Sequence, residues 1–126
     1  MEQAFFCNSG AEANEAALKL ARKYGKFSGG RTHVISMKDS FHGRTFGSLS
    51  TTGQKKYQKN FYPLLNGVSY ATFNDLASVS NLVDSNTCAI IVEPLQGEGG
   101  IIPATKAFLQ GLRKIADEQD LILIFD

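Results

Sequence analysis

The sequence lacks several features that assign a protein class by themselves. Its 126 residues include two cysteines, Cys7 and Cys88, far apart and without a C-x-x-C pair, which excludes a disulfide scaffold or a zinc ribbon. The net charge of +1 gives no field that would favour nucleic acid or an anionic membrane. The longest apolar runs, such as 121–125, are too short to span a bilayer, and no secretory signal is recognisable. We therefore expect a protein of a reducing, cytoplasmic compartment.

What the sequence does contain is an alternation of strand and helix patterns. The composition, 43% hydrophobic and 20% charged, is that of an ordinary globular domain. Because strand and helix patterns alternate along the chain, we predict an α/β fold with a mostly parallel sheet. The predicted strands cover 4–7, 32–37, 68–71, 87–92 and 121–125, and the predicted helices cover 11–24, 54–60, 75–83 and 105–119.

Several local expectations follow from these patterns. Alanines 13, 16, 17 and 21, with Leu20 and Tyr24, predict the buried face of the first helix, which Gly25 would end. The polar segment 39–53 predicts an irregular, functional loop. The runs 4–7 and 121–125 predict buried strands, the second without alternation and so covered on both faces. Because such strands need neighbours, we expect the chain to be a fragment of a longer protein.

Polar residues follow the predicted strands. Ligands of open parallel sheets bind beyond the carboxyl ends of the strands. The residues at those ends are 8–10, 40–44, Glu93 with 96–98, and Asp126. We therefore expect any functional site at this edge of the sheet.

The segment Ser9-Gly10-Ala11-Glu12 joins the first strand to the first helix. Ser9 and Glu12 have the spacing of a capping box, which needs no ligand. The same geometry also suits an anion, because Gly10 lets backbone amides approach it and the helix N-terminus favours negative charge. The sequence leaves both interpretations open. The segment 9–12 is neither a Walker loop nor a G-x-G-x-x-G motif.

Three further segments carry candidate residues. Phe41 and Arg44 offer an aromatic face and a guanidinium, although, taken alone, a core aromatic and a solvated arginine are the better explanation. His42 is a candidate general base, but a lone histidine is more often structural. The two carboxylates in 93–98 suit acid/base chemistry or a solvated turn. Asp126 ends the most apolar strand, where it would either cap a following helix or hold a cationic ring nitrogen.

Taken together, these segments resemble one enzyme family. The motifs are FCNSGAEANE at 6–15, FHGRT at 41–45, EPLQGE at 93–98 and IFD at 124–126. In this order they resemble the class-III, fold-type-I pyridoxal-phosphate aminotransferases. The wording of the first motif and TGQKKYQ at 52–58 is most similar to acetylornithine aminotransferases. The resemblance implies a three-layer sandwich, with 1–126 forming part of the large cofactor-binding domain.

The resemblance also implies roles for single residues. Ser9, Gly10 and Ala11 would cradle the phosphate of pyridoxal phosphate, Phe41 would stack on its ring, and Asp126 would pair with the ring nitrogen. Arg44 would bind a substrate carboxylate, and Glu98 would pair with an arginine elsewhere in the protein. Glu93 and Gln96 would support the site.

One essential group of the family is absent. Its transaminases need a lysine that forms a Schiff base with the cofactor, and none of the nine lysines here lies in that context. The catalytic-lysine region and the small domain are missing, so we expect no catalytic residue in this chain and no activity from it alone. The full-length protein is expected to be a homodimer. It would transfer an amino group between N-acetylornithine, or an ornithine-like donor, and 2-oxoglutarate in arginine biosynthesis.

Two alternatives remain at this stage. The first is a non-catalytic α/β module that binds a phosphorylated small molecule through residues 9–11. The second is a purely structural or assembly segment. The acyl group of the substrate is left open because the pocket that would select it is not in this sequence.

Overall fold

The computed structural model describes residues 3–126 and confirms the α/β class. Strands and helices alternate along most of the chain, as the hydrophobic pattern predicts. In chain order the elements are α1 (Gly10–Phe27), β1 (His33–Met37), α2 (Phe46–Thr51), α3 (Lys55–Gln58), β2 (Val68–Ala71), α4 (Leu76–Ser80), β3 (Thr87–Val92), β4 (Leu95–Gln96), β5 (Ile102–Pro103), α5 (Lys106–Glu118) and β6 (Ile122–Phe125).

Four strands form a parallel sheet in the order β2-β1-β3-β6. The central strand β3 is buried at every position and is rich in β-branched residues, as expected of a strand covered on both faces. Its register pairs Ile90 with Ile35 of β1 and with Leu123 of β6. The carboxyl ends of all four strands therefore lie at one edge of the sheet. The short strands β4 and β5 form a separate antiparallel pair.

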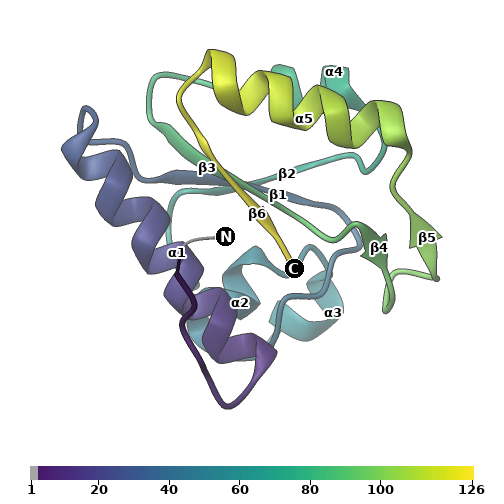
Figure 1. Cartoon of the computed structure of the whole chain (residues 1–126). Coiled ribbons are helices and arrows are strands. Elements are labelled where there is room, and N and C mark those ends of the chain that lie inside the picture. Colours follow the sequence, from purple (N-terminus) through teal and green to yellow (C-terminus); the bar gives the residue numbers. More distant parts are fainter. Residues whose placement is uncertain (1–2) are drawn as a thin grey trace.

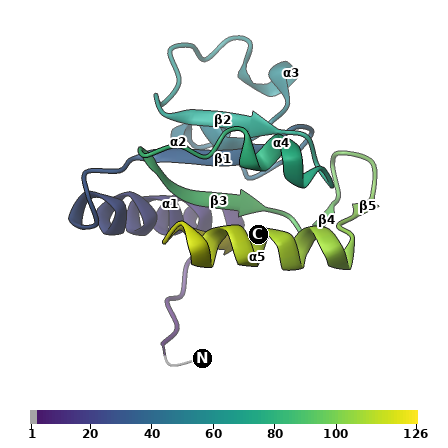
Figure 2. The same ribbon diagram turned by 90° about the horizontal axis from the view of Figure 1, so that it is seen from above.

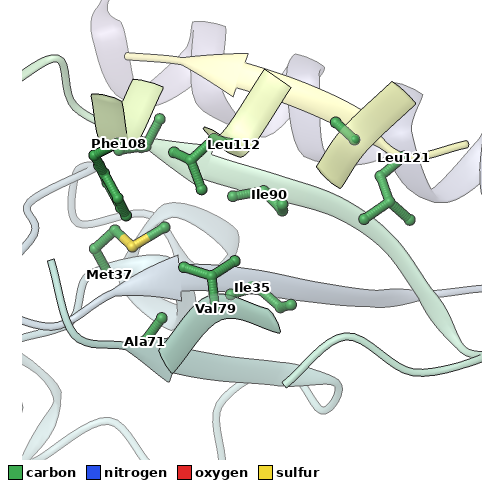
Figure 3. Packing of buried hydrophobic residues seen from close by; sticks show 10 residues of the cluster. Ile35, Met37, Ala71, Val79, Ile90, Phe108, Leu112 and Leu121 are labelled. Atoms are coloured by element: carbon green, nitrogen blue, oxygen red, sulfur yellow. The ribbon is translucent and has the colours of Figure 1, made fainter. Parts of the chain in front are cut away.

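Helices cover both faces of the sheet and make three layers. In Figure 1, α1 and α2 lie on one face, and α4 and α5 lie on the other. The core under α4 and α5 is the larger one; Figure 3 shows Phe108 and Leu112 of α5 packed toward Met37, Val79 and Ile90. The core under α1 contains Leu18, Ala21, Val34, Cys88, Ala89, Ile91 and Ile124. This arrangement is the expected three-layer sandwich.

The buried face of α1 differs from the predicted one. The buried residues are Asn14, Leu18, Ala21 and Gly25, whereas Leu20 and Tyr24 are exposed. The helix also continues past Gly25 to Phe27, because Gly25 is needed inside it: a Cβ there would lie 2.5 Å from the Cβ of Cys88 on β3. Here glycine allows close packing of helix on strand and does not end the helix.

Residues 4–7 do not form the predicted buried strand. They run extended and exposed, with Phe5 79% and Phe6 91% accessible. Figure 2 shows this segment running away from the sheet before α1 begins. A strand needs a hydrogen-bonding partner, and within 3–126 no strand edge lies beside this segment. The prediction of buried strands is also wrong for part of β6, which within residues 3–126 pairs with β3 alone and leaves Phe125 half exposed.

Three other segments differ in detail. The predicted loop 39–53 contains the buried helix α2, and the glycine-rich segment after Glu93 is closed by the β4–β5 pair. Helix α4 is capped by Asp75, which accepts a hydrogen bond from the Ser78 amide at 3.1 Å. No helix within residues 3–126 combines the length and the apolarity needed to cross a bilayer.

Candidate functional site

The loop that follows β1 links the polar residues at the ends of the strands. Residues 41–44 touch the first turn of α1, the residue that follows β3 and the residue that follows β6. This convergence agrees with the rule that ligands of parallel sheets bind beyond the strand ends.

The first turn of α1 is capped and open toward solvent. The amide of Glu12 donates to Ser9 Oγ at 3.2 Å, and Glu12 Oε2 accepts from the amide of Asn8 at 2.8 Å. The glutamate therefore reaches one residue further back than in a standard capping box. A Cβ built on Gly10 meets nothing within 4 Å, so the backbone there faces open space. The capping prediction is confirmed, and the turn remains accessible to an anion.

Gly43 brings the loop against this turn. It has φ +122°, and a Cβ there would lie 2.7 Å from the Cβ of Ala11. Ser48 of α2 donates from its hydroxyl to the carbonyl of Ala11 at 3.0 Å. Both contacts require a residue without a side chain at position 43, because any Cβ would push the loop away from α1.

The buried His42 pairs with the partly exposed Asp126. Nδ1 of His42 lies 2.7 Å from Oδ2 of Asp126, and the imidazole is fully buried. Asn14 of α1 donates to the His42 carbonyl at 2.9 Å, which fixes the backbone of the loop. Nε2 of His42 is buried and has no hydrogen-bond partner within residues 3–126. The pair joins the loop after β1 to the end of β6.

The environment of Asp126 keeps its carboxylate ionised. Burial raises the pKa of Asp126. Hydrogen bonds from His42 and Asn14, together with the charge of the imidazole, lower it by more than burial raises it, so the pKa lies below its ordinary value. Its side chain is still 25% exposed, so one face of the carboxylate is accessible. An ionised, partly open carboxylate suits a cationic partner.

Glu93 orients the backbone of Phe41. The carboxylate follows β3, is buried, and accepts from the Phe41 amide at 3.0 Å. Burial raises the pKa of Glu93 above its ordinary value, although the hydrogen bond from the Phe41 amide and the charge of His42 lower it in part. Gln96 is also buried and donates to the Lys38 carbonyl at 2.9 Å, which holds the β4–β5 pair beside the end of β1. Both residues thus contact the loop or strand that carries Phe41.

Arg44 and Glu98 both lie beside an aromatic pair, Phe41 and Tyr57. The rings of Phe41 and Tyr57 pack edge to face, 5.3 Å between centroids. The Arg44 guanidinium carbon lies 5.7 Å from the first centroid and 5.9 Å from the second. Glu98 Oε2 is 3.4 Å from the Tyr57 hydroxyl. The two charged residues singled out for substrate binding are therefore connected through Tyr57.

The sequence alone gives no specific role to three residues of this site. Asn14 and Glu15 lie within the motif at 6–15, and Tyr57 lies within the motif at 52–58. Glu15 Oε1 accepts from Thr45 Oγ1 at 2.6 Å and from the Gly47 amide at 2.7 Å, so it caps α2 from another helix. The only available signal was a polar residue, Asn14, on the helix face that packs against the sheet.

Comparison with known proteins identifies the family of this arrangement. The profile of the family described as Aminotransferase class-III matches residues 1–126. A succinylornithine transaminase of Salmonella paratyphi B is 57% identical over 127 aligned residues, which cover 99% of this chain and 31% of the relative. The chain thus spans about a third of the length of the curated relatives it matches.

Solved structures agree in fold. The ornithine aminotransferase of Toxoplasma gondii superposes with a TM-score of 0.88 at 31% identity, covering 95% of this chain and 29% of that one. An amine transaminase from an uncultivated Pseudomonas species, in a PLP-bound form, superposes with a TM-score of 0.85 at 27% identity, covering 94% of this chain and 32% of that one. With the strand-end residues arranged as described, the chain belongs to the class-III aminotransferases.

Proposed function

We propose that this chain is the part of a pyridoxal-phosphate-dependent transaminase that holds the cofactor ring and phosphate. The observation that carries the proposal is the ionised Asp126, joined to the loop that also presents Phe41 and contacts the first turn of α1. When bound, pyridoxal phosphate supplies the electron-withdrawing ring on which amino groups are exchanged. The residues present fit that group: Asp126 offers a negative charge, Phe41 an aromatic surface, and the first turn of α1 an open backbone.

Each residue then has a binding or orienting role. The backbone of Ser9, Gly10 and Ala11 would bind the phosphate, since the amides of a first helical turn have no intrahelical acceptor. Phe41 would cover one face of the ring. Asp126 would keep the ring nitrogen protonated, because a nearby anion favours the cationic form.

Neighbouring residues would hold these groups in position. Nδ1 of His42, 2.7 Å from Asp126, would orient the carboxylate, and the Glu93 carboxylate would fix the Phe41 backbone. Gln96 would hold the neighbouring hairpin in place. Arg44 would bind a substrate carboxylate, and Glu98 would pair with an arginine elsewhere in the protein. None of these groups is proposed as the residue bonded to the cofactor.

For the substrate we propose an acylated ornithine as amino donor and 2-oxoglutarate as acceptor, with N-acetylornithine as the donor implied by the motifs. The 57% identical relatives carry the name succinylornithine transaminase, so N-succinylornithine is the competing donor. We place the reaction in arginine biosynthesis. The full-length protein would be a homodimer of the cytoplasm, a compartment that suits the two free thiols.

The test is an amino-transfer assay with the full-length protein. N-acetylornithine, N-succinylornithine and ornithine are offered in turn with 2-oxoglutarate, and glutamate formation is measured. We expect kcat/KM for an acylated donor to exceed that for ornithine by at least about tenfold, equivalent to about 1.4 kcal/mol. Glutamate formation from none of the three would overturn the proposal and favour a module that only binds a phosphorylated ligand.

A further inference from the structure

A hollow beside α1 is lined by four cations and, within residues 3–126, by no acidic residue. Its volume of about 760 Å³ is in the range of small-molecule sites. The wall includes Lys19, Arg22, Lys23 and Lys26 of α1, with Thr32 and Asn66 from the loops before β1 and β2. The hollow therefore lies beyond the amino ends of these two strands, whereas the candidate site for the cofactor lies at their carboxyl ends.

The four cations are not neutralised by acids of the described chain. None of them has a carboxylate oxygen within 4 Å in the part of the chain that the structure describes. Nη2 of Arg22 donates to the Asn66 carbonyl at 2.6 Å, which fixes the guanidinium at the wall and uses one of its five N–H donors. The three lysine side chains are exposed.

The spacing of these cations is unfavourable for α1 itself. Lys19 and Lys23 are four residues apart, as are Arg22 and Lys26, and like charges at this spacing destabilise a helix. The negative end of the helix dipole favours a cation only in the last turn, where Lys26 lies. Stabilisation of the helix therefore accounts for one cation of the four, and the described chain offers the other three no counter-charge.

We propose that this hollow binds a compact polyphosphate, either alone or attached to a nucleoside. Four positive charges around one hollow match an anion with several negative charges, and both lysine and arginine bind phosphate oxygens well. Ala16 and Leu20 also line the hollow, and Leu20 is 66% exposed, so an apolar surface for a base lies beside the cations. This inference goes beyond the proposed function and does not depend on it.

The first experiment maps the site in the wild-type protein. The full-length holoenzyme, in which the cofactor occupies its own phosphate site, is acetylated by a lysine-reactive ester with and without excess tripolyphosphate. Mass spectrometry measures the acetylation of each lysine. We expect acetylation of Lys19, Lys23 and Lys26 to fall at least about threefold, the protection given by a site that is two-thirds occupied. Lys106 and Lys114 of α5 should be unaffected, and equal protection of all lysines, or of none, would overturn the proposal.

The second experiment removes the charges. The triple variant Lys19→Gln/Lys23→Gln/Lys26→Gln keeps Arg22 and its contact with Asn66. Calorimetry should show Kd for tripolyphosphate raised at least about tenfold, as expected for the loss of three exposed ion pairs. Because the substitutions relieve repulsion along α1, the variant should be at least as stable to urea as the wild type. Unchanged affinity in this variant would overturn the proposal.

A matched control removes the same charge elsewhere. Lys59→Gln/Lys106→Gln/Lys114→Gln replaces three exposed lysines outside the hollow and should change Kd by less than about twofold, because distant surface charges are screened by salt. Equal weakening in the two triple variants would show an effect of net charge alone and would overturn the site.

ATP in place of tripolyphosphate distinguishes the two forms of the ligand. An affinity for ATP at least about tenfold higher, lost in Leu20→Ser, would assign a nucleoside polyphosphate to the hollow. Equal affinities that Leu20→Ser leaves unchanged would assign the polyphosphate alone. Binding of neither anion to the wild-type holoenzyme would overturn the proposal in both forms.

Discussion

At the scale of single residues, the contact between His42 and Asp126 explains how a carboxylate stays ionised at the end of an apolar strand. Hydrogen bonds from the imidazole and from Asn14 outweigh the cost of burial. The sequence placed Asp126 at a strand end and suggested a cationic partner, but it could not supply His42 as the neighbour. That contact joins residues 84 positions apart, and no local pattern encodes it.

The Asp126 pair predicts a specific pH dependence of stability. Because the folded pKa of Asp126 is depressed, its stabilising effect is present above the unfolded pKa of about 3.9 and is lost as pH falls through the folded pKa. Asp126→Asn should therefore lower the free energy of unfolding at pH 7, and the deficit should shrink below about pH 4. Urea unfolding at several pH values measures this difference.

A matched control is Asp117→Asn, which removes only an exposed ion pair with Arg113. It should change the free energy of unfolding by at most about 0.5 kcal/mol at either pH. An Asp126→Asn deficit of the same size at pH 3 and pH 7 would contradict the account of this carboxylate.

Two glycines distinguish packing from ligand access. A Cβ on Gly47 would fall on the Glu15 carboxylate, whereas a Cβ on Gly10 meets nothing within 4 Å. Gly47→Ala should therefore destabilise the fold by about 1–3 kcal/mol, and Gly10→Ala should change stability by less than about 1 kcal/mol. Urea unfolding of both variants gives the comparison. Equal stability of the two would show that the α1–α2 contact is less tight than described.

At the scale of elements, prediction succeeded where the cause of the structure is local. The strands at 68–71 and 87–92 match the observed bounds. The second is specified by its β-branched residues, which fill four of its six positions. Helix α2 was missed because its sequence, FGSLST, has weak helix formers and its cap is Glu15 from another helix. The face of α1 was misassigned because Asn14 and Gly25, both unusual in a core, occupy its buried positions.

The cap on α2 can be tested directly. Glu15 accepts hydrogen bonds from the Thr45 hydroxyl and from the amides of Gly47 and Ser48. Glu15→Ala leaves these donors without an acceptor and should lower the free energy of unfolding by about 1–3 kcal/mol. Glu12→Ala, which removes one exposed contact near the start of α1, should cost about 1 kcal/mol or less. If the two variants lose the same stability, Glu15 does not act as an interhelical cap.

At the scale of the whole molecule, two of the exposed apolar side chains lie on backbone with an open hydrogen-bonding edge. Strand β6 has only one partner within residues 3–126, and Phe125 on it is 54% exposed. Phe6, in the unpaired segment before α1, is 91% exposed. An open strand edge and exposed aromatic rings favour association between chains.

We therefore expect the isolated 126-residue chain to self-associate as its concentration rises. Sedimentation velocity measures the mass distribution. The double variant Phe6→Lys/Phe125→Lys should shift it toward the monomer, and Phe61→Lys, at another exposed ring, should not. A wild-type chain that stays monomeric at every concentration would contradict this expectation.

The location of the candidate site could be predicted from the sequence, and its internal contacts could not. The rule that ligands bind at the strand ends selected Phe41 and Asp126 after strands that form, and Ser9 after a predicted strand, 4–7, that does not form. The fold still connects the three segments through one loop. The roles of Asn14 and Tyr57 depend on which elements pack together, which only the tertiary structure determines.

The most direct test is the distance from Asp126 to the cofactor ring in the full-length protein crystallised with pyridoxal phosphate. The account predicts that the ring nitrogen lies within hydrogen-bonding distance of the Asp126 carboxylate, about 2.6–3.2 Å, with the phosphate at the amides of residues 9–11 and Phe41 over the ring. A cofactor bound elsewhere, or bound with Asp126 turned away from the ring nitrogen, would contradict it.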